Sequence, residues 1–343
     1  MNKLRKIGIT ALAGSLASVS AAQAGSMAVS GSAELTWISQ DADEVTGNPI
    51  GQKKNLSFSG SGELDNGWTF GVMHAMNDAM SGLSSSNVTL TMGSLGTIAF
   101  DAGTGGYGGT AVDNVVPTAW EEADDGFSTG MSDIGAVSGS KNILNYTTPA
   151  HGTTGSKLSL TWAPRTGAAH VADGGSGKTD GGRGYDIAVV LINAGGVTIG
   201  GAVSEIEVEN KTARTGGSHA GSHEDEWEAT AYVKAAFGPI SLGIQQSAES
   251  TGTNKSTGIA HKKSAAGGIA INLMDNFSIG YQKLKSYVDM NTDYEKIAAT
   301  FEGYTAAYNM GPLAIKYKDN EVTNLNNTHG NDSQKEVSIS MAF

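Results

Sequence analysis

Apolar side chains recur at every second position in many short segments of this chain. The final segment shows the pattern clearly, since Val337, Ile339, Met341 and Phe343 alternate with small serine and alanine residues. Because successive side chains of a strand point to opposite faces, such a segment has one apolar face and one small polar face. A chain built mostly of these segments is predicted to be all-β.

Turn signals separate about sixteen such segments, a count based on period-two alternation. Tight turns such as Asp65-Asn66-Gly67 and Gly238-Pro239 alternate with longer polar connections, among them 40–52 and 320–333. An even strand number, with short connections at one end and long ones at the other, is typical of an antiparallel transmembrane β-barrel. Its short turns are periplasmic and its long loops lie outside. Fourteen or eighteen strands also fit, because three segments alternate only weakly.

The chain begins with a segment typical of a secretory signal peptide. A basic start, 2–6, precedes an apolar run over 7–19, and Ala22-Gln23-Ala24 matches a small-residue cleavage site. The run is short for a spanning helix and is interrupted by glycine, serine and threonine. We therefore expect residues 1–24 to be removed and residues 25–343 to form one transmembrane β-barrel domain.

The composition narrows the class further. The formal net charge is −12, whereas nucleic-acid binding requires clustered Lys and Arg, so a nucleic-acid partner is disfavoured. The sequence has no cysteine, 48 glycines and only 6 prolines. These values argue against disulfides, thiolate metal sites, long helices and proline-rich disorder. A surface adhesin built as a β-solenoid is an alternative, although we find no fixed repeat of about 20–30 residues.

Aromatic residues lie in phase with the apolar set near the ends of the predicted strands. This placement predicts aromatic girdles at the two membrane interfaces. The alternative is the core of a soluble β-sandwich. The residues are Trp37, Phe58, Trp68, Phe70, Trp162, Phe237, Phe277, Tyr281, Tyr317 and Phe343.

The longest strand-poor interval, 101–140, is the third long connection of the predicted barrel. Between Asp101 and Asp133 it carries seven acidic residues and no Lys or Arg. Carboxylates in a narrow aqueous pore raise the local concentration of cations and repel anions. We therefore predict a modest preference for cations if this connection enters the barrel. A solvated acidic loop on the outer surface is the alternative.

Three features together resemble the general porins of Gram-negative outer membranes, particularly the alphaproteobacterial type. They are the export signal, the alternating C terminus with Phe343, and the acidic segment 115–126. The resemblance implies a sixteen-stranded homotrimer in outer-membrane lipid, with the third loop folded into the pore. It implies passive diffusion of ions and small hydrophilic solutes. It also implies that the barrel-assembly machinery reads Phe343.

The resemblance places acidic residues of the third loop at the pore constriction and basic residues on the opposite wall. The acidic residues are Asp113, Glu121, Glu122, Asp124 and Asp125. The basic residues near plausible wall positions are Lys53, Lys54, Lys141, Arg165 and Arg183. This set is sparser than the arginine cluster of the family, so the cations that face the loop stay open at this point.

Other motifs match known sites poorly. Residues 103–108 fit G-x-G-x-x-G and residues 172–179 approximate a phosphate-binding loop, but neither opens a convincing helix in a βαβ unit. His219 and His223 could bind a metal with nearby acids, and loop oxygens could bind Ca²⁺, although nothing fixes their geometry. No nucleophile signature stands out. We therefore expect a channel without enzymatic activity or cofactor, with a substrate-specific channel as the alternative.

Overall fold

The computed structural model describes residues 25–41, 48–128, 134–167, 182–207, 224–252, 259–290 and 297–343. The predicted signal segment lies outside these residues. The described residues form sixteen strands: β1 (Ser26–Gln40), β2 (Ile50–Glu63), β3 (Thr69–Met76), β4 (Leu83–Thr91), β5 (Thr97–Ala102), β6 (Lys141–Thr147), β7 (Lys157–Ala163), β8 (Gly184–Ala194), β9 (Val197–Ile206), β10 (Glu226–Phe237), β11 (Ile240–Ser250), β12 (Ile259–Met274), β13 (Phe277–Met290), β14 (Ala299–Met310), β15 (Leu313–Leu325) and β16 (Gly330–Ala342). Two short 3₁₀ helices, η1 (Gly93–Leu95) and η2 (Gly108–Ala111), accompany them. No helix in the described ranges is long and apolar enough to cross a membrane.

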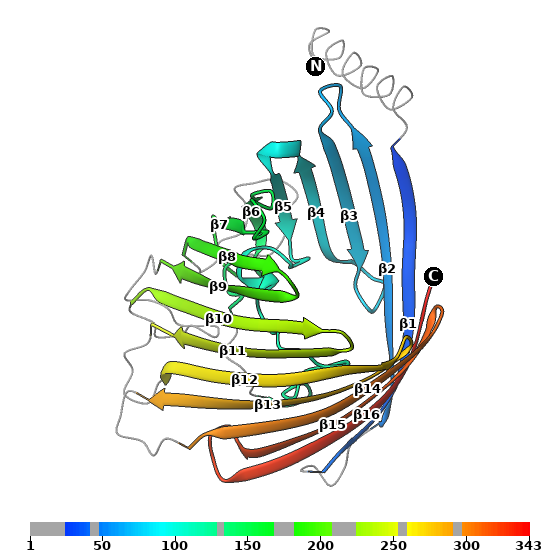
Figure 1. Cartoon of the computed structure of the whole chain (residues 1–343), viewed down its shortest axis with the longest axis vertical. Helices are drawn as coiled ribbons and strands as arrows, with labels where there is room; N and C mark the ends of the chain where they lie inside the picture. Colours follow the sequence, from blue (N-terminus) through cyan, green and yellow to red (C-terminus); the bar gives the residue numbers. More distant parts are fainter. Residues whose placement is uncertain are drawn as a thin grey trace.

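The strands close into one antiparallel barrel. Each strand pairs with its neighbours in sequence, and β1 pairs with β16 over 32–40. Beyond that ladder, the Gly31 N–H donates to the Phe343 carbonyl oxygen at 3.1 Å, and the Phe343 N–H donates to the Gly31 carbonyl oxygen at 2.9 Å. The C terminus accordingly lies beside β1 (Figure 1). The closed order confirms the predicted barrel with sixteen strands and excludes a β-solenoid.

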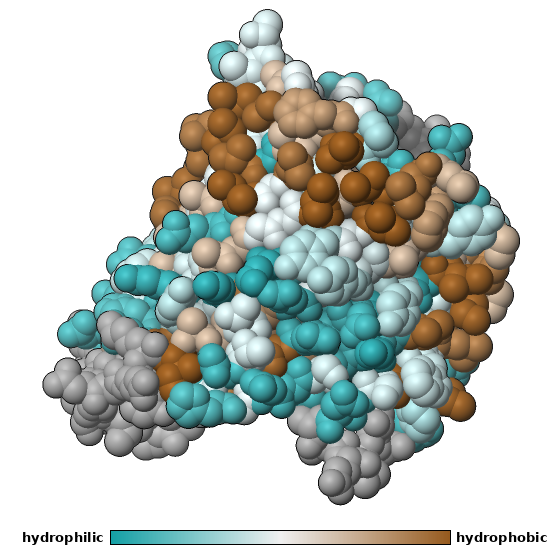
Figure 2. Space-filling view, turned by 60° about the horizontal axis from the view of Figure 1, so that its bottom comes forward, coloured by the Kyte–Doolittle hydropathy of each residue, from teal (hydrophilic) through white to brown (hydrophobic). Residues whose placement is uncertain are grey.

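The two faces of the wall differ in chemistry, as the alternation predicts. On β16, Val337, Ile339 and Met341 are exposed on the outer face, whereas Glu336 and Ser338 are buried on the inner face. The outer surface carries a brown apolar zone and, next to it, a teal polar zone (Figure 2). In a membrane-spanning barrel the apolar outer residues contact lipid, so their exposure on the isolated chain is expected.

Aromatic residues mark both ends of the apolar band on β10. Trp227 and Phe237 are exposed on its outer face and differ by 10 positions (237 − 227). Ten residues of a strand tilted by about 45° rise about 24 Å, close to the ~25 Å height of the apolar band of such barrels. The spacing of these two aromatics therefore matches a membrane-spanning strand.

Two predicted connections are shorter in the structure. β15 and β16 continue through most of 320–333, where Asn320 pairs with Gln334. This stretch is mostly polar, so its sequence shows little of the apolar alternation that marks the other strands. β4 likewise begins at Leu83 rather than near Val88. Strands that extend beyond the lipid band need no apolar outer face, which explains why the pattern missed them.

Phe343 covers the seam where the barrel closes. Its ring lies against Gly31, at which an added Cβ would be 2.6 Å from the ring Cζ. We expect Phe343→Ala to lower the fraction of folded, heat-modifiable protein in the membrane, measured by gel mobility with and without heating. Met341→Ala, which shortens another exposed outward side chain of the same segment, should retain more folded protein. Equal folded fractions for the two variants would contradict a special role for Phe343.

Candidate functional site

The third loop, defined as residues 103–140 between β5 and β6, lies inside the barrel as predicted. Its described parts are 103–128 and 134–140. Near its start, the Gly108 N–H donates to the Ser159 hydroxyl on β7 at 3.2 Å. Near its far end, the Asp125 carboxylate contacts the Lys318 ammonium on β15. The loop therefore crosses the inner wall from β7 to β15.

Apolar side chains pack the loop against this wall. Val116 belongs to a buried cluster whose wall residues include Leu284 and Phe301, which are 2% and 0% exposed. Ile134 belongs to a second buried cluster that includes Tyr232 on β10. Apolar residues on the inner face of an open barrel would meet water, so the loop explains why Leu284 and Phe301 occur at inward positions.

Glycines on four neighbouring strands let the loop backbone approach the wall closely. Each faces the lumen, and a Cβ added at each would come within 3.0 Å of the loop. They are Gly243 on β11, Gly268 on β12, Gly280 on β13 and Gly303 on β14. At Gly268, the added Cβ would lie 2.6 Å from the Pro117 carbonyl oxygen. This set, called the glycine track below, leaves space that any larger residue would fill.

Amide side chains of the wall bind the loop backbone. Gln245 on β11 accepts the Val115 N–H at 2.9 Å and donates to the Val112 carbonyl oxygen at 3.0 Å. Gln282 on β13 accepts the Ala123 N–H at 2.7 Å. Backbone groups of a loop that leaves the solvent need partners, and these side chains supply them. The glycine track thus lets one continuous stretch of the loop approach the wall, and the two glutamines bind that stretch through hydrogen bonds.

A charged cluster on β15 binds the far end of the loop. Asn320 donates to the carbonyl oxygens of Glu122 at 2.9 Å and of Asp125 at 3.1 Å. The side chain of Lys318 is 1% exposed, and its ammonium contacts the Asp125 carboxylate and lies 2.9 Å from Glu336 Oε2. A buried ammonium is stable only with such partners. Asp125, predicted at the constriction, therefore anchors the loop.

Trp120 lies over two lysines beside this cluster. Its ring centroid is 4.9 Å from Lys316 Nζ and 5.7 Å from Lys318 Nζ, which are cation–π distances. Lys316 Nζ also lies 2.9 Å from Glu34 Oε1 on β1. The loop is thus tied to both sides of the β1–β16 seam.

Two acids of the wall hold the two ends of the loop. Asp186 on β8 accepts the Gly109 N–H at 2.6 Å. Glu228 on β10 accepts the Ala136 N–H at 3.2 Å and the Ser204 hydroxyl at 2.9 Å. The sequence interpretation did not single out these acids. Their signal was an acidic residue at an inward position of a strand, Asp186 between Gly184 and Ala188 on β8 and Glu228 between Glu226 and Thr230 on β10.

Four of the five predicted acids of the loop lie close to one another. Burial raises the pKa of the Glu122 carboxyl, and the negative charges of Asp124, Glu121 and Asp113 raise it further. Because salt screens charges, two carboxylates affect each other's pKa only when they lie close together. These interactions link Asp113, Glu121, Glu122 and Asp124, here called the acidic group, whereas the carboxylate of Asp125 is paired with Lys318.

The predicted basic residues of β2 point to opposite faces. Lys53 faces the lumen, where it is paired in register with Glu34. Lys54 lies on the outer face together with Phe58, because adjacent side chains of a strand alternate. Its predicted place on the pore wall is corrected accordingly.

The other predicted basic residues are also spread out. Lys141 begins β6 and lies beside the start of the loop, with its Cε 3.5 Å from a Cβ built at Gly103. Arg165 follows β7. Arg183 lies beside Glu207, with Nε 3.4 Å from the carboxylate, and both are exposed. The structure does not gather the five predicted bases into one cluster. Two lysines that the sequence interpretation missed, Lys316 and Lys318, contact the far end of the loop.

The inner face of β1 and β2 carries small polar side chains. Ser30 pairs with Ser57, Ser32 with Asn55 and Ser59 with Ala28, while the charged pair Glu34 and Lys53 lies farther along the same face. Hydroxyl and amide groups bind water and neutral polar solutes without adding charge. This part of the wall therefore differs from the acidic surface of the loop.

The remaining motifs carry no site in the described residues. The glycines of 103–108 adopt left-handed conformations, with φ of +88° at Gly103, so the backbone itself requires them. The stretch 172–179 and the pair His219 and His223 lie outside the described residues. Within the described ranges, no group of three or more His, Cys, Asp or Glu residues has a metal-binding arrangement.

A family model described as Gram-negative porin matches residues 8–342. None of the curated proteins matches the chain. Among solved structures, a porin refined at 1.8 Å resolution is 15% identical, with a TM-score of 0.63 and coverage of 93% of this chain and 100% of that chain. The anion-selective porin from Comamonas acidovorans is 15% identical, with a TM-score of 0.58 and coverage of 93% and 100%. Salmonella typhi OmpF in complex with daunomycin is 12% identical, with a TM-score of 0.62 and coverage of 93% and 98%. At these identities the similarity shows a shared fold.

Adjacent glycines of β12 provide a test of the glycine track. Gly268→Val should push the loop away from the wall, because overpacking costs about 1–3 kcal/mol. Hydrogen exchange of the Val115 and Ala123 amides should then accelerate by about tenfold or more. Gly267→Val is the matched control, since Gly267 faces outward and its added Cβ has its nearest neighbour at 3.8 Å. Unchanged loop protection in Gly268→Val would show that the track does not position the loop.

Proposed function

Because the chain belongs to the Gram-negative porin family, we propose that its third loop forms the constriction of the channel and gives it a modest preference for cations. The protein is an outer-membrane channel for passive diffusion of ions and small hydrophilic solutes. A sixteen-stranded barrel is wide enough to leave an aqueous passage. The position of the loop inside the barrel supports its role in narrowing that passage.

The acidic group carries the proposal. Its four carboxylates lie together on the loop, and the nearest lysines already contact other acids. Lys316 lies beside Glu34, and Lys318 lies between Asp125 and Glu336. Lys316 and Lys318 thus contact three carboxylates outside the acidic group, those of Glu34, Asp125 and Glu336. A net negative charge in a narrow pore with low-dielectric walls concentrates cations and repels anions.

Assembly and processing are part of the same proposal. We expect a homotrimer, cleavage after residue 24 and recognition of Phe343 by the barrel-assembly machinery. Vibrio cholerae OmpT, described in a trimer form, supports the first expectation; it is 10% identical, with a TM-score of 0.58 and coverage of 93% of this chain and 99% of that chain. The proposal assigns the chain no chemical reaction and no resident cofactor.

Neutralising the acidic group should lower the cation preference. In Asp113→Asn/Glu121→Gln/Glu122→Gln/Asp124→Asn, the reversal potential under a KCl gradient in a planar bilayer should move toward the value of a non-selective pore. The wild-type preference should weaken as salt rises, because the Debye length is already only about 8 Å at physiological ionic strength. An anion-preferring wild type, or an unchanged variant, would contradict the proposal.

A control variant changes the same number of charges outside the constriction. Glu63, Asp65 and Asp275 lie at or beside the short turns, and Glu205 is exposed on the outer face of β9. Their combined replacement by Gln or Asn should change the reversal potential much less.

The same recordings separate a general channel from a substrate-specific one, since only the latter shows saturable block of the current by one solute.

The pH dependence of selectivity should depend on Glu122. Burial and the neighbouring negative charges raise the pKa of this carboxyl above the ordinary value of about 4.3. As the pH falls, Glu122 therefore becomes neutral before an ordinary glutamate does, and the cation preference should begin to decline at a higher pH. Glu122→Gln should remove this early decline, whereas Glu121→Gln should retain most of it. An identical pH profile in wild type and Glu122→Gln would contradict the assignment.

A further inference from the structure

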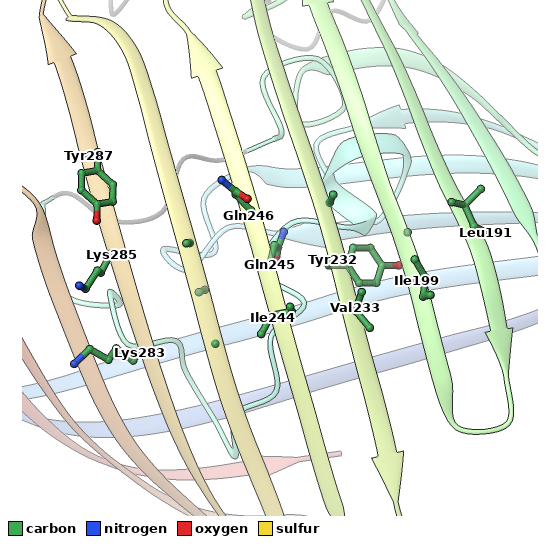
Figure 3. A pocket seen from close by; sticks show the side chains of 15 residues that line it. Leu191, Ile199, Tyr232, Val233, Ile244, Gln245, Gln246, Lys283, Lys285 and Tyr287 are labelled. Carbon is green, nitrogen blue, oxygen red and sulfur yellow. The ribbon is translucent and has the colours of Figure 1, made fainter.

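We propose that the outer face of the barrel carries a binding site for one phosphate-bearing, anionic membrane lipid. The site is a hollow of about 760 Å³ on the outer surface between β8 and β13. Ile199, Val233 and Ile244 border it on one side, and Lys283 and Lys285 border it on the other (Figure 3). An apolar wall and a cationic wall thus face the same space, on a surface that contacts lipid.

The floor of the hollow is a row of five residues, three of which are small. Going from strand to strand by register, Lys285 is followed by Ala265, Gln246, Ala231 and Gly201. Neighbouring strands are about 4.8 Å apart, so this row extends roughly 19 Å across the outer face. Ala265, Ala231 and Gly201 stop at Cβ or before, whereas Lys285 at one end of the row and Gln246 in its middle carry longer polar side chains. The row is therefore a trough, shallow on both sides of Gln246, and an acyl chain can lie along it with its headgroup at Lys285.

The lysines lie within the span that lipid is expected to cover. On β13, Phe277 and Tyr287 share the outer face with Lys283 and Lys285 between them. Phe277 follows the short turn and Tyr287 lies 10 positions farther on (287 − 277), the same spacing as the two aromatics of β10. Charged residues on the lipid face of a barrel are destabilising unless they reach a polar partner. Lys285 lies near the end of the long loops, at the depth where lipid headgroups begin.

The local charge is positive. Lys283 forms an ion pair with Glu302 on β14. No carboxylate in the described parts of the chain forms an ion pair with Lys285, which is exposed and stands opposite Ala265 and Thr300 in the two adjoining ladders. Two ammonium groups and one carboxylate leave one positive charge at the end of the trough. A phosphate ester complements that charge, and lysine binds phosphate as a point charge.

The shape of the hollow favours a lipid over a second copy of the chain. Protein interfaces pack at the density of protein interiors, so a second barrel pressed on this face would have to fill the trough with matching side chains. A flexible acyl chain fills a shallow trough without such a match. The Gln246 amide lies two strands from Lys285 and can also bind an ester oxygen of the lipid.

The test uses the full purified barrel in detergent and native mass spectrometry. The probes are phosphatidic acid, phosphatidylcholine with the same acyl chains, and inorganic phosphate. The wild type should retain one phosphatidic acid molecule at concentrations where phosphatidylcholine is not retained. Lys285→Gln should weaken retention about tenfold, the effect of losing one charge-assisted contact. Ala231→Phe should weaken it as well, because its ring fills the trough.

Matched controls test the cationic end of the site and its floor separately. Lys335→Gln removes an outward lysine of β16 that pairs with Asp319 far from the hollow, and Ala235→Phe adds the same ring on β10 outside the hollow. Both should retain phosphatidic acid as the wild type does. Equal retention in all variants would overturn the proposal in favour of unspecific lipid contact. Binding of inorganic phosphate that Ala231→Phe leaves unchanged would indicate a phosphate site instead. A changed subunit number in Ala231→Phe would indicate that a second copy covers the face.

Discussion

The constraint on which the structure depends is that every backbone polar group of a membrane-spanning sheet must find a partner within the sheet. Lipid offers no hydrogen bonds, so an open sheet edge is not tolerated there. The pairing of β1 with β16, completed by the two hydrogen bonds between Gly31 and Phe343, removes that edge. In the closed barrel, the outer face of each strand contacts lipid and its inner face contacts water or the third loop. The alternation seen in the sequence follows from this division.

The third loop changes which residue types occur on the inner face. Where it lies on the wall, inward residues such as Leu284 and Phe301 are apolar and buried, and the glycine track replaces side chains altogether. On β1 and β2 the inward residues are mostly small and polar, apart from the charged pair Glu34 and Lys53. The residue types at inward positions therefore indicate where the loop lies on the wall. The covering also explains why glutamine and asparagine occur at inward positions of β11, β13 and β15, since the loop backbone needs partners of that kind.

The sequence predicted most of the fold because lipid imposes period-two alternation over the membrane span. The extension of β15 and β16 through 320–333 was missed because that part extends beyond the apolar pattern. The site was predictable only in part. The acids of the third loop could be identified from their position between β5 and β6, and the inward direction of Lys316 and Lys318 was implicit in the alternation of β15. Their contact with the loop depends on strand register and on the path of the loop, neither of which a single sequence specifies.

Carboxylates in the lumen have two physically distinct roles, and their surroundings decide which. Asp125 faces the buried Lys318 ammonium, and Asp186 and Glu228 accept hydrogen bonds from backbone N–H groups. Each of these three carboxylates holds the loop against the wall. The Lys318 ammonium opposes the field of Asp125 at close range, and the backbone N–H dipoles offset part of the charge of Asp186 and Glu228. The carboxylates of the acidic group lie close enough to repel one another, since the charges of Asp124, Glu121 and Asp113 raise the pKa of Glu122. That repulsion is tolerable only because the loop is fixed by other contacts. The anchoring acids are therefore what allows the acidic group to stay concentrated at one level of the barrel.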